Sequence, residues 1–255
     1  MVKIEAPKLM THMIAGFPDY SRALEIAESL VEGGADYLEI QFPFSDPSAD
    51  GPIIEKACME ALAAGFRTKE GFSLVHKITT RYEVPVFIMS YASIVYTCGM
   101  DQFTAAAAES GATGLIVPDL PFDSDEGLQE SARVAGLFAV PVVVPGMSEG
   151  RLAALSERRP GYIYTSLRTG ITGGVTEIGE TNISFLKQLR ETGAEIWGGF
   201  GISRRSQIDA LSGHLDTVVV GSEILRTIRG SLDRGSDVRS EIKEKVGILK
   251  CKNQE

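Results

Sequence analysis

The sequence is poor in the residues that bind metals or form disulfide bonds. Its 255 residues include only three cysteines and three histidines. Cys58, Cys98 and Cys251 are odd in number and lack metal-type spacing, so we expect a reduced protein of the cytoplasm. The histidines form no constellation that fits a metal site or a Ser-His-Asp triad. The sequence therefore supports neither metal chemistry nor serine-hydrolase chemistry.

Long hydrophobic runs and an excess of positive charge are also missing. No apolar run reaches the roughly 18–20 residues of a membrane helix, and no signal peptide is evident, so we expect a soluble protein. The formal net charge of −9 argues against nucleic-acid binding. A small phosphorylated ligand stays compatible with this charge, because backbone N–H groups can bind an anion locally.

Strand-like and helix-like segments alternate along the chain without a break in composition. Eight segments have the pattern of buried strands, namely residues 9–15, 36–42, 84–91, 114–118, 138–144, 161–166, 195–199 and 217–220. Helical patterns cover residues 21–32, 53–64, 69–81, 100–110, 124–135, 148–157, 181–191, 203–211, 222–228 and 232–248. This alternation predicts an α/β protein with a single (β/α)8 TIM barrel over residues 1–255. We expect residues 243–255 to form a frayed tail.

One stretch combines a strand with two acids: Leu38-Glu39-Ile40-Gln41-Phe42-Pro43-Phe44-Ser45-Asp46-Pro47-Ser48-Ala49-Asp50-Gly51-Pro52. Glu39 interrupts an apolar strand, where a buried carboxylate costs several kcal/mol unless it is paired or protonated. Asp50 lies on a proline-stiffened loop just before a helix. Two carboxylates in different environments suit general acid–base catalysis. A structural ion pair for Glu39 and a helix cap for Asp50 are the alternatives.

Glycines cluster after three of the predicted strands. They occur in Thr169-Gly170-Ile171-Thr172-Gly173-Gly174, in Gly199-Phe200-Gly201 and in Gly221-Ser222. Barrels of this kind often bind phosphate after strands 7 and 8, where backbone N–H groups and a helix N-terminus attract the anion. Each pair alone is equally typical of a tight turn. The second set lacks the third glycine of a dinucleotide fingerprint.

The stretch from Leu38 to Pro52 resembles the signature of tryptophan synthase α subunits, and the resemblance extends over residues 9–229. It implies a lyase that cleaves indole-3-glycerol phosphate to indole and D-glyceraldehyde 3-phosphate by retro-aldol chemistry in tryptophan biosynthesis. In this reading Glu39 protonates the indole ring at C3. Asp50 holds the indole N–H and stabilises the positive charge that develops on the ring.

The resemblance also implies roles for further residues. Tyr91 and Tyr164 would line the indole pocket, Asp119 would support its floor, and Thr172 would contact Asp50 when a lid at residues 168–179 closes. The phosphate would bind to Gly173, Phe200, Gly201, Gly221 and Ser222. Asp46 would contact a partner, although an Asx-turn before Pro47 explains it equally well.

The resemblance also implies a partner and its cofactor. The chain itself would need no cofactor, whereas pyridoxal phosphate would belong to a tryptophan synthase β subunit in an α2β2 heterotetramer. Two alternatives keep the same barrel: a stand-alone lyase that requires no β partner, and a weakly active α-like subunit that mainly activates β. A phosphosugar isomerase is a weaker analogy that rests on the fold alone.

The chain departs from the family pattern at several positions. Only about eight residues precede the first strand, where family members begin with an extra helix that plugs the barrel bottom. Phe17 stands where the family usually has Asp, and Gln41 replaces a Gly. His12 occupies a position that is usually aromatic, and we expect it to be a core residue with a satisfied hydrogen bond.

Overall fold

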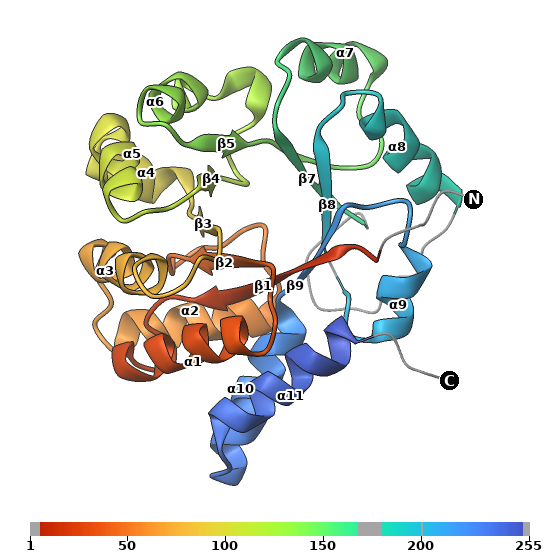
Figure 1. Cartoon of the computed structure of the whole chain (residues 1–255). Helices are drawn as coiled ribbons and strands as arrows, with labels where there is room; N and C mark the ends of the chain where they lie inside the picture. The colour runs from red at the N-terminus through yellow and green to blue at the C-terminus, as the bar shows by residue number, and fades with distance from the viewer. Residues whose placement is uncertain (1–5, 168–179, 200, 252–255) are drawn as a thin grey trace.

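The computed structural model describes residues 6–167, 180–199 and 201–251. Within these residues, nine parallel strands form one sheet in the order β5-β4-β3-β2-β1-β9-β8-β7-β6. The strands are arranged in a ring (Figure 1). Their bounds are β1 (Lys8–Ile14), β2 (Tyr37–Gln41), β3 (Val86–Met89), β4 (Gly114–Ile116), β5 (Phe138–Val140), β6 (Val142–Val143), β7 (Tyr162–Ser166), β8 (Glu195–Gly199) and β9 (Thr217–Val220).

One extended segment closes this ring. β5 pairs with β4, β6 pairs with β7, and a single residue, Pro141, separates β5 from β6. Proline has no N–H to donate, so the strand predicted at residues 138–144 is interrupted there. The carbonyl of Pro141 still accepts the amide N–H of Tyr164 at 3.0 Å. β5 and β6 together take the place of the fifth of eight strands, and the predicted (β/α)8 barrel is confirmed.

Helices surround the ring of strands (Figure 1). They are α1 (Tyr20–Glu32), α2 (Pro52–Ala63), α3 (Thr68–Thr79), α4 (Ala92–Cys98), α5 (Met100–Glu109), η1 (Phe122–Ser124, a 3-10 helix), α6 (Leu128–Val134), α7 (Glu149–Glu157), α8 (Glu180–Arg190), α9 (Arg205–Ala210), α10 (Ser222–Arg234) and α11 (Val238–Lys250). α4 has no counterpart among the predicted helices, because its 7 residues are too few to show a clear period. None of the helices in the described part of the chain has the length and apolarity to cross a bilayer.

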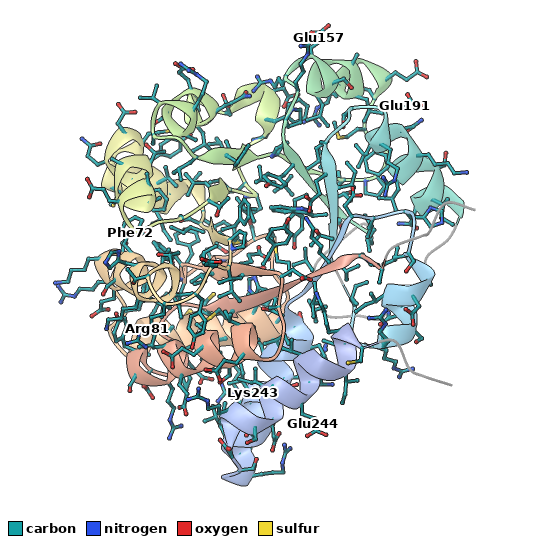
Figure 2. All side chains as sticks on the ribbon, viewed as in Figure 1. Phe72, Arg81, Glu157, Glu191, Lys243 and Glu244 are labelled. Carbon is teal, nitrogen blue, oxygen red and sulfur yellow. The ribbon has the colours of Figure 1, made fainter. Side chains whose placement is uncertain are left out.

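The end of α11 corrects the prediction of a frayed tail, which is wrong for residues 243–250. Val246 and Leu249 of this helix are buried, so the apolar face fixes the helix against the barrel. Arg205 donates hydrogen bonds to the carbonyls of Leu249 and Lys250 at 2.9 and 2.7 Å, which satisfies acceptors at the helix end. Lys243, labelled on α11 in Figure 2, forms an ion pair with α1.

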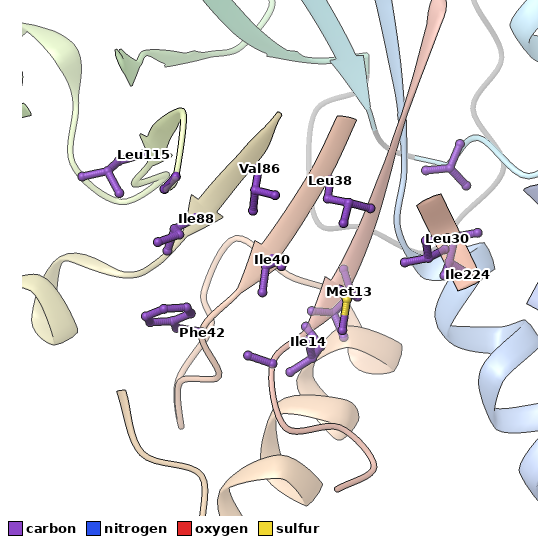
Figure 3. Close-up of a cluster of buried hydrophobic side chains, with 14 of the residues drawn as sticks. Met13, Ile14, Leu30, Leu38, Ile40, Phe42, Val86, Ile88, Leu115 and Ile224 are labelled. Atoms are coloured by element: carbon purple, nitrogen blue, oxygen red, sulfur yellow. The ribbon is translucent and has the colours of Figure 1, made fainter. Parts of the chain in front are cut away.

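Side chains of β2 alternate between two cores. Leu38 and Ile40 belong to the core between strands and helices, part of which is drawn in Figure 3. Tyr37 belongs to a second cluster, inside the barrel. Because successive strand residues face opposite sides, Glu39 and Gln41 share the inward side with Tyr37. The alternation of the sequence thus places a carboxyl group and an amide inside the barrel.

Aromatic rings and one carboxylate fill the amino-terminal end of the barrel. Trp197 packs edge to face on Phe87, with ring centroids 4.6 Å apart, and lies 5.6 Å from the ring of Tyr37. Glu195, the first residue of β8, accepts hydrogen bonds from Trp197 Nε1 at 3.0 Å and from Thr217 Oγ1 at 2.8 Å. The barrel is therefore closed at this end by its own side chains.

Candidate active site

Glu39 is held inside the barrel next to His12. The two residues are direct register partners on the parallel strands β2 and β1, so their side chains point to the same side. Nδ1 of His12 lies 3.3 Å from Oε2 of Glu39, and the two side chains are 5% and 3% exposed. At this depth solvent does little to stabilise a charge on either group, so any charge there depends on the neighbouring group.

Asp50 is fixed at the end of the loop that follows β2. Its amide N–H donates to the carbonyl of Pro47 at 2.9 Å, which closes a tight turn just before α2 begins. Its Oδ2 atom accepts two hydrogen bonds of 2.8 Å, from Gln41 Nε2 and from the hydroxyl of Tyr91. Residues from two neighbouring strand ends therefore set the direction in which this carboxylate points.

The pKa of Asp50 is raised above its usual value. Burial is the main cause, and the charge of Glu39 acts in the same direction. The positive charge of His12 and the hydrogen bonds from Gln41 and Tyr91 oppose this shift. Three neighbouring side chains thus give Asp50 polar surroundings, although its carboxyl group is partly buried.

Tyr91 ties the Asp50 loop to the third strand. Its hydroxyl accepts the amide N–H of Ala49 at 3.1 Å while it donates to Asp50, and its ring stacks on Phe44 at 5.3 Å. Asp119, in the turn after β4, supports this arrangement, because its Oδ1 atom accepts the amide N–H of the residue after Tyr91 at 2.9 Å. Asp119 is exposed, and its contact with the site is through the backbone next to Tyr91.

Tyr164 points into the barrel from β7, close to both acids. Burial of its hydroxyl, together with the charges of Glu39 and Asp50, raises the pKa of Tyr164 well above the usual value, so the phenol stays neutral. A Cβ atom on Gly199 would lie 2.8 Å from this hydroxyl, so the neighbouring strand needs a glycine there. The predicted residues Glu39, Asp50, Tyr91 and Tyr164 thus meet at one end of the barrel.

The predicted phosphate residues are described in part. Gly221 precedes α10, and Ser222 is the first residue of this 13-residue helix, where backbone N–H groups are free of intrahelical bonds. Gly201 adopts a positive φ of 80°, and its carbonyl accepts from Gln207 at 3.1 Å. Thr172, Gly173 and Phe200 lie outside the described residues, as does the whole predicted lid at 168–179.

His12 and Gln41 are site residues whose position the sequence did not predict. His12 is buried as expected, but its Nε2 atom has no hydrogen-bond partner among the described residues, so the expected satisfied hydrogen bond is wrong for this nitrogen. His12 packs on Gly221, where an added Cβ would lie 3.3 Å from its side chain. The two-residue spacing of Glu39 and Gln41 was the available signal, because it places both on the inner face.

Cys58 lies near the site but is unsuited to nucleophilic catalysis. Burial raises the pKa of the Cys58 thiol to about 12, so this cysteine is a poor nucleophile. Its sulfur lies 3.5 Å from Gln41 Nε2 and acts as a weak acceptor. No group of three or more potential metal ligands occurs in the described ranges. Asp46 is exposed on the loop before Asp50.

The sequence matches a known protein family over nearly the whole length of the chain. A family model described as tryptophan synthase alpha chain matches residues 2–254. The chain belongs to this family. The tryptophan synthase alpha chain of Helicobacter hepaticus is 35% identical over 229 residues, which cover 87% of this chain and 86% of that protein.

Solved structures of tryptophan synthase have the same fold. The structure of the Mycobacterium tuberculosis enzyme aligns with a TM-score of 0.86 at 27% identity and covers 97% of this chain and 94% of that chain. The tryptophan synthase complex from Pyrococcus furiosus gives 0.84 at 29% identity, with coverages of 95% and 97%.

Two departures from the pattern of tryptophan synthase α subunits have a structural explanation. Phe17 is 1% exposed, and its ring lies 5.0 Å from the guanidinium of Arg229 in α10. A cation–π contact therefore anchors the turn after β1, where the resemblance implied Asp. Gln41 fills the space next to Asp50 with a hydrogen-bond donor, which a glycine could not supply.

Proposed function

We propose that this chain acts in the cytoplasm as the α subunit of tryptophan synthase and cleaves indole-3-glycerol phosphate to indole and D-glyceraldehyde 3-phosphate. The observation that carries the proposal is the pair of acids at one end of the barrel. Glu39 is deeply buried beside an imidazole, and Asp50 is held by two donors. Two carboxyl groups in such different surroundings can serve different roles in one reaction.

The cleavage needs C3 of the indole ring to become a leaving group. Glu39 donates a proton to C3, which converts the ring to an indolenine with a positive charge at N1. The bond from C3 to the glyceryl carbon then breaks, and its electron pair returns to the ring. The glyceryl hydroxyl loses its proton to the Glu39 carboxylate and becomes the aldehyde, so the proton count balances.

Asp50 has a separate role at N1. Its carboxylate accepts the indole N–H and balances the positive charge that develops on the ring in the transition state. The hydrogen bonds from Gln41 and Tyr91 favour the ionised form that this role requires. Tyr91 and Tyr164 would line the indole pocket, and Asp119 would support it through the backbone next to Tyr91.

The phosphate would bind at the ends of β8 and β9. Backbone N–H groups of Gly201, Gly221 and Ser222, together with the N-terminus of α10, favour an anion. Thr172, Gly173 and Phe200 complete the proposed set. Binding of this remote group orients the reacting bond, so part of the binding free energy lowers the barrier.

The proposed partner is a tryptophan synthase β subunit, in an α2β2 heterotetramer. The loop that carries Asp46 and Asp50 lies at the carboxyl ends of the strands, where it can connect a docked partner with the site. A similar solved structure is described as a tryptophan synthase complex. The cleavage itself uses acids and backbone groups only, so pyridoxal phosphate would be held by the β partner and none by this chain.

Indole release from indole-3-glycerol phosphate, measured with and without the β chain of the same organism, tests this function. We expect indole and glyceraldehyde 3-phosphate in equal amounts, and faster release with the β chain. Light scattering should show the complex at micromolar concentrations. Failure of the isolated chain and of the mixture to release indole would refute the lyase. High activity without any association would favour the stand-alone enzyme instead.

A further inference from the structure

The imidazole of His12 is in direct contact with the acid that the proposed mechanism uses. Its Nδ1 atom lies 3.3 Å from Oε2 of Glu39, and register pairing of β1 with β2 fixes this contact from the backbone. His12 also packs on Gly221, the residue that follows β9, and β9 is the other strand that pairs with β1. Two adjacent strands therefore hold the imidazole against Glu39.

The charged groups around His12 favour its protonated form. Burial alone would disfavour the imidazolium, but the charge of Glu39, 3.3 Å away, and the charge of Asp50 raise the pKa of His12. Glu39 acts from β2 and Asp50 from the loop before α2. Tyr164, which approaches both acids from β7, is kept neutral by its raised pKa and adds no charge. The charges that act on His12 are therefore those of Glu39, which it contacts, and of Asp50.

We propose that His12 and Glu39 form one acid–base unit that shares a single proton, with His12 as a positioning residue that acts through Glu39. The proposal rests on the function proposed above. A buried ion pair of this kind adds little to folding stability by itself. Its consequence is chemical, because it stores a proton 3.3 Å from the group that must deliver it.

The proton path through this unit is balanced. In the resting unit the proton is on Nδ1 of His12 and Glu39 is ionised. Transfer to Oε2 gives a neutral imidazole and a carboxylic acid, which protonates C3 of the indole ring. When the carbon–carbon bond breaks, the glyceryl hydroxyl gives its proton to the carboxylate, and the proton returns to Nδ1. Contacts of this length commonly shorten when the substrate binds.

Histidine NMR tests the pairing without any catalytic turnover. The chain has three histidines, so each imidazole can be followed by pH titration, and the signal that His12→Asn removes identifies His12. Replacement of Glu39 by Gln should lower the titration midpoint of His12 by roughly one pH unit or more, as loss of an adjacent opposite charge does. An unchanged midpoint in the folded variant would overturn the shared proton.

Kinetics test what the pairing does. His12→Asn keeps a donor near the position of Nδ1 but cannot titrate. A coupled pair loses its last proton at a higher pH than either group would alone. Removal of the imidazole should therefore move the alkaline limb of the kcat–pH profile to lower pH by roughly one to three units. His12→Phe should show the same shift with a larger loss of kcat, because the donor is also gone. His76→Asn, an exposed change of the same type, should leave the profile unchanged.

The outcomes separate this proposal from the lyase function. A His12→Asn enzyme with the wild-type pH profile would show that His12 only fills space and would overturn the proposal. If His12→Phe does not fold, His12→Asn alone decides. If the wild-type protein releases no indole, the lyase function fails, whereas the NMR titration still accepts or rejects the proton-sharing pair.

Discussion

Gln41 donates a hydrogen bond of 2.8 Å from Nε2 to Oδ2 of Asp50. The same oxygen accepts the hydroxyl of Tyr91, which also anchors the backbone at Ala49. The loop end is therefore fixed by side chains of β2 and of the residue before α4, inside one chain. This relationship suggests that Asp50 is already in position before a partner docks, and that partner activation of cleavage is correspondingly modest.

Replacement of Gln41 by Met tests this preorganisation. Met has a similar volume but cannot donate, and a hydrogen bond to a charged group contributes about 1.5–3 kcal/mol. We therefore expect indole release by the isolated chain to fall by roughly 10-fold or more, and the β chain to restore part of it. Gln188→Met, on the exposed side of α8, is the matched control. A Gln41→Met enzyme as active as wild type would show that Tyr91 alone suffices.

Glu39→Gln should abolish the lyase reaction while the barrel stays folded. The amide keeps the shape of the carboxyl group but cannot donate and then accept the proton. We expect kcat to fall by at least the roughly 10²–10⁴-fold typical of a general acid–base group. Rapid-quench or coupled assays give kcat, and circular dichroism reports the fold. Near-normal turnover by folded protein would remove Glu39 from the mechanism.

The pH dependence of stability should reveal His12. Its folded-state pKa is raised above the ordinary value of 6.5, so the folded state binds more protons than the unfolded state above that pH. This stabilisation is complete below about pH 6.5 and is lost as the pH rises through the folded-state pKa, with a slope of up to about 1.4 kcal/mol per pH unit. Urea unfolding of wild type and His12→Asn between pH 6 and 9 should show a steeper slope in wild type.

Glu195→Leu should destabilise the protein without changing its chemistry. The change leaves Trp197 Nε1 and Thr217 Oγ1 buried without their acceptor, which costs about 1–3 kcal/mol for each group. Urea denaturation measures the loss, and indole release per folded molecule should stay normal, because Glu195 lies at the opposite end of the barrel from Asp50. Glu191→Leu, an exposed change just after α8, should alter stability by less than about 0.5 kcal/mol.

The barrel and both acids could be predicted from the sequence, because strand-end positions and alternation are local properties. The interruption at Pro141 could have been predicted from its missing N–H. The pairing of His12 with Glu39 could not, because it depends on the register between β1 and β2, which neither strand specifies alone. The helical structure of residues 243–250 likewise depends on Arg205, which is distant in the sequence and donates hydrogen bonds to the last carbonyls of α11.

The closed amino-terminal end of the barrel has a consequence for molecular traffic. Trp197, Phe87 and Tyr37 fill the axis below the site, and Glu195 with Lys8 covers them at an ion-pair distance of 3.2 Å. Within the described residues this end of the interior is therefore filled by side chains, and Asp50 lies at the other end. We therefore expect substrate and products to pass at the Asp50 end, so that a protein seated there would decide whether indole escapes into solvent or passes onward.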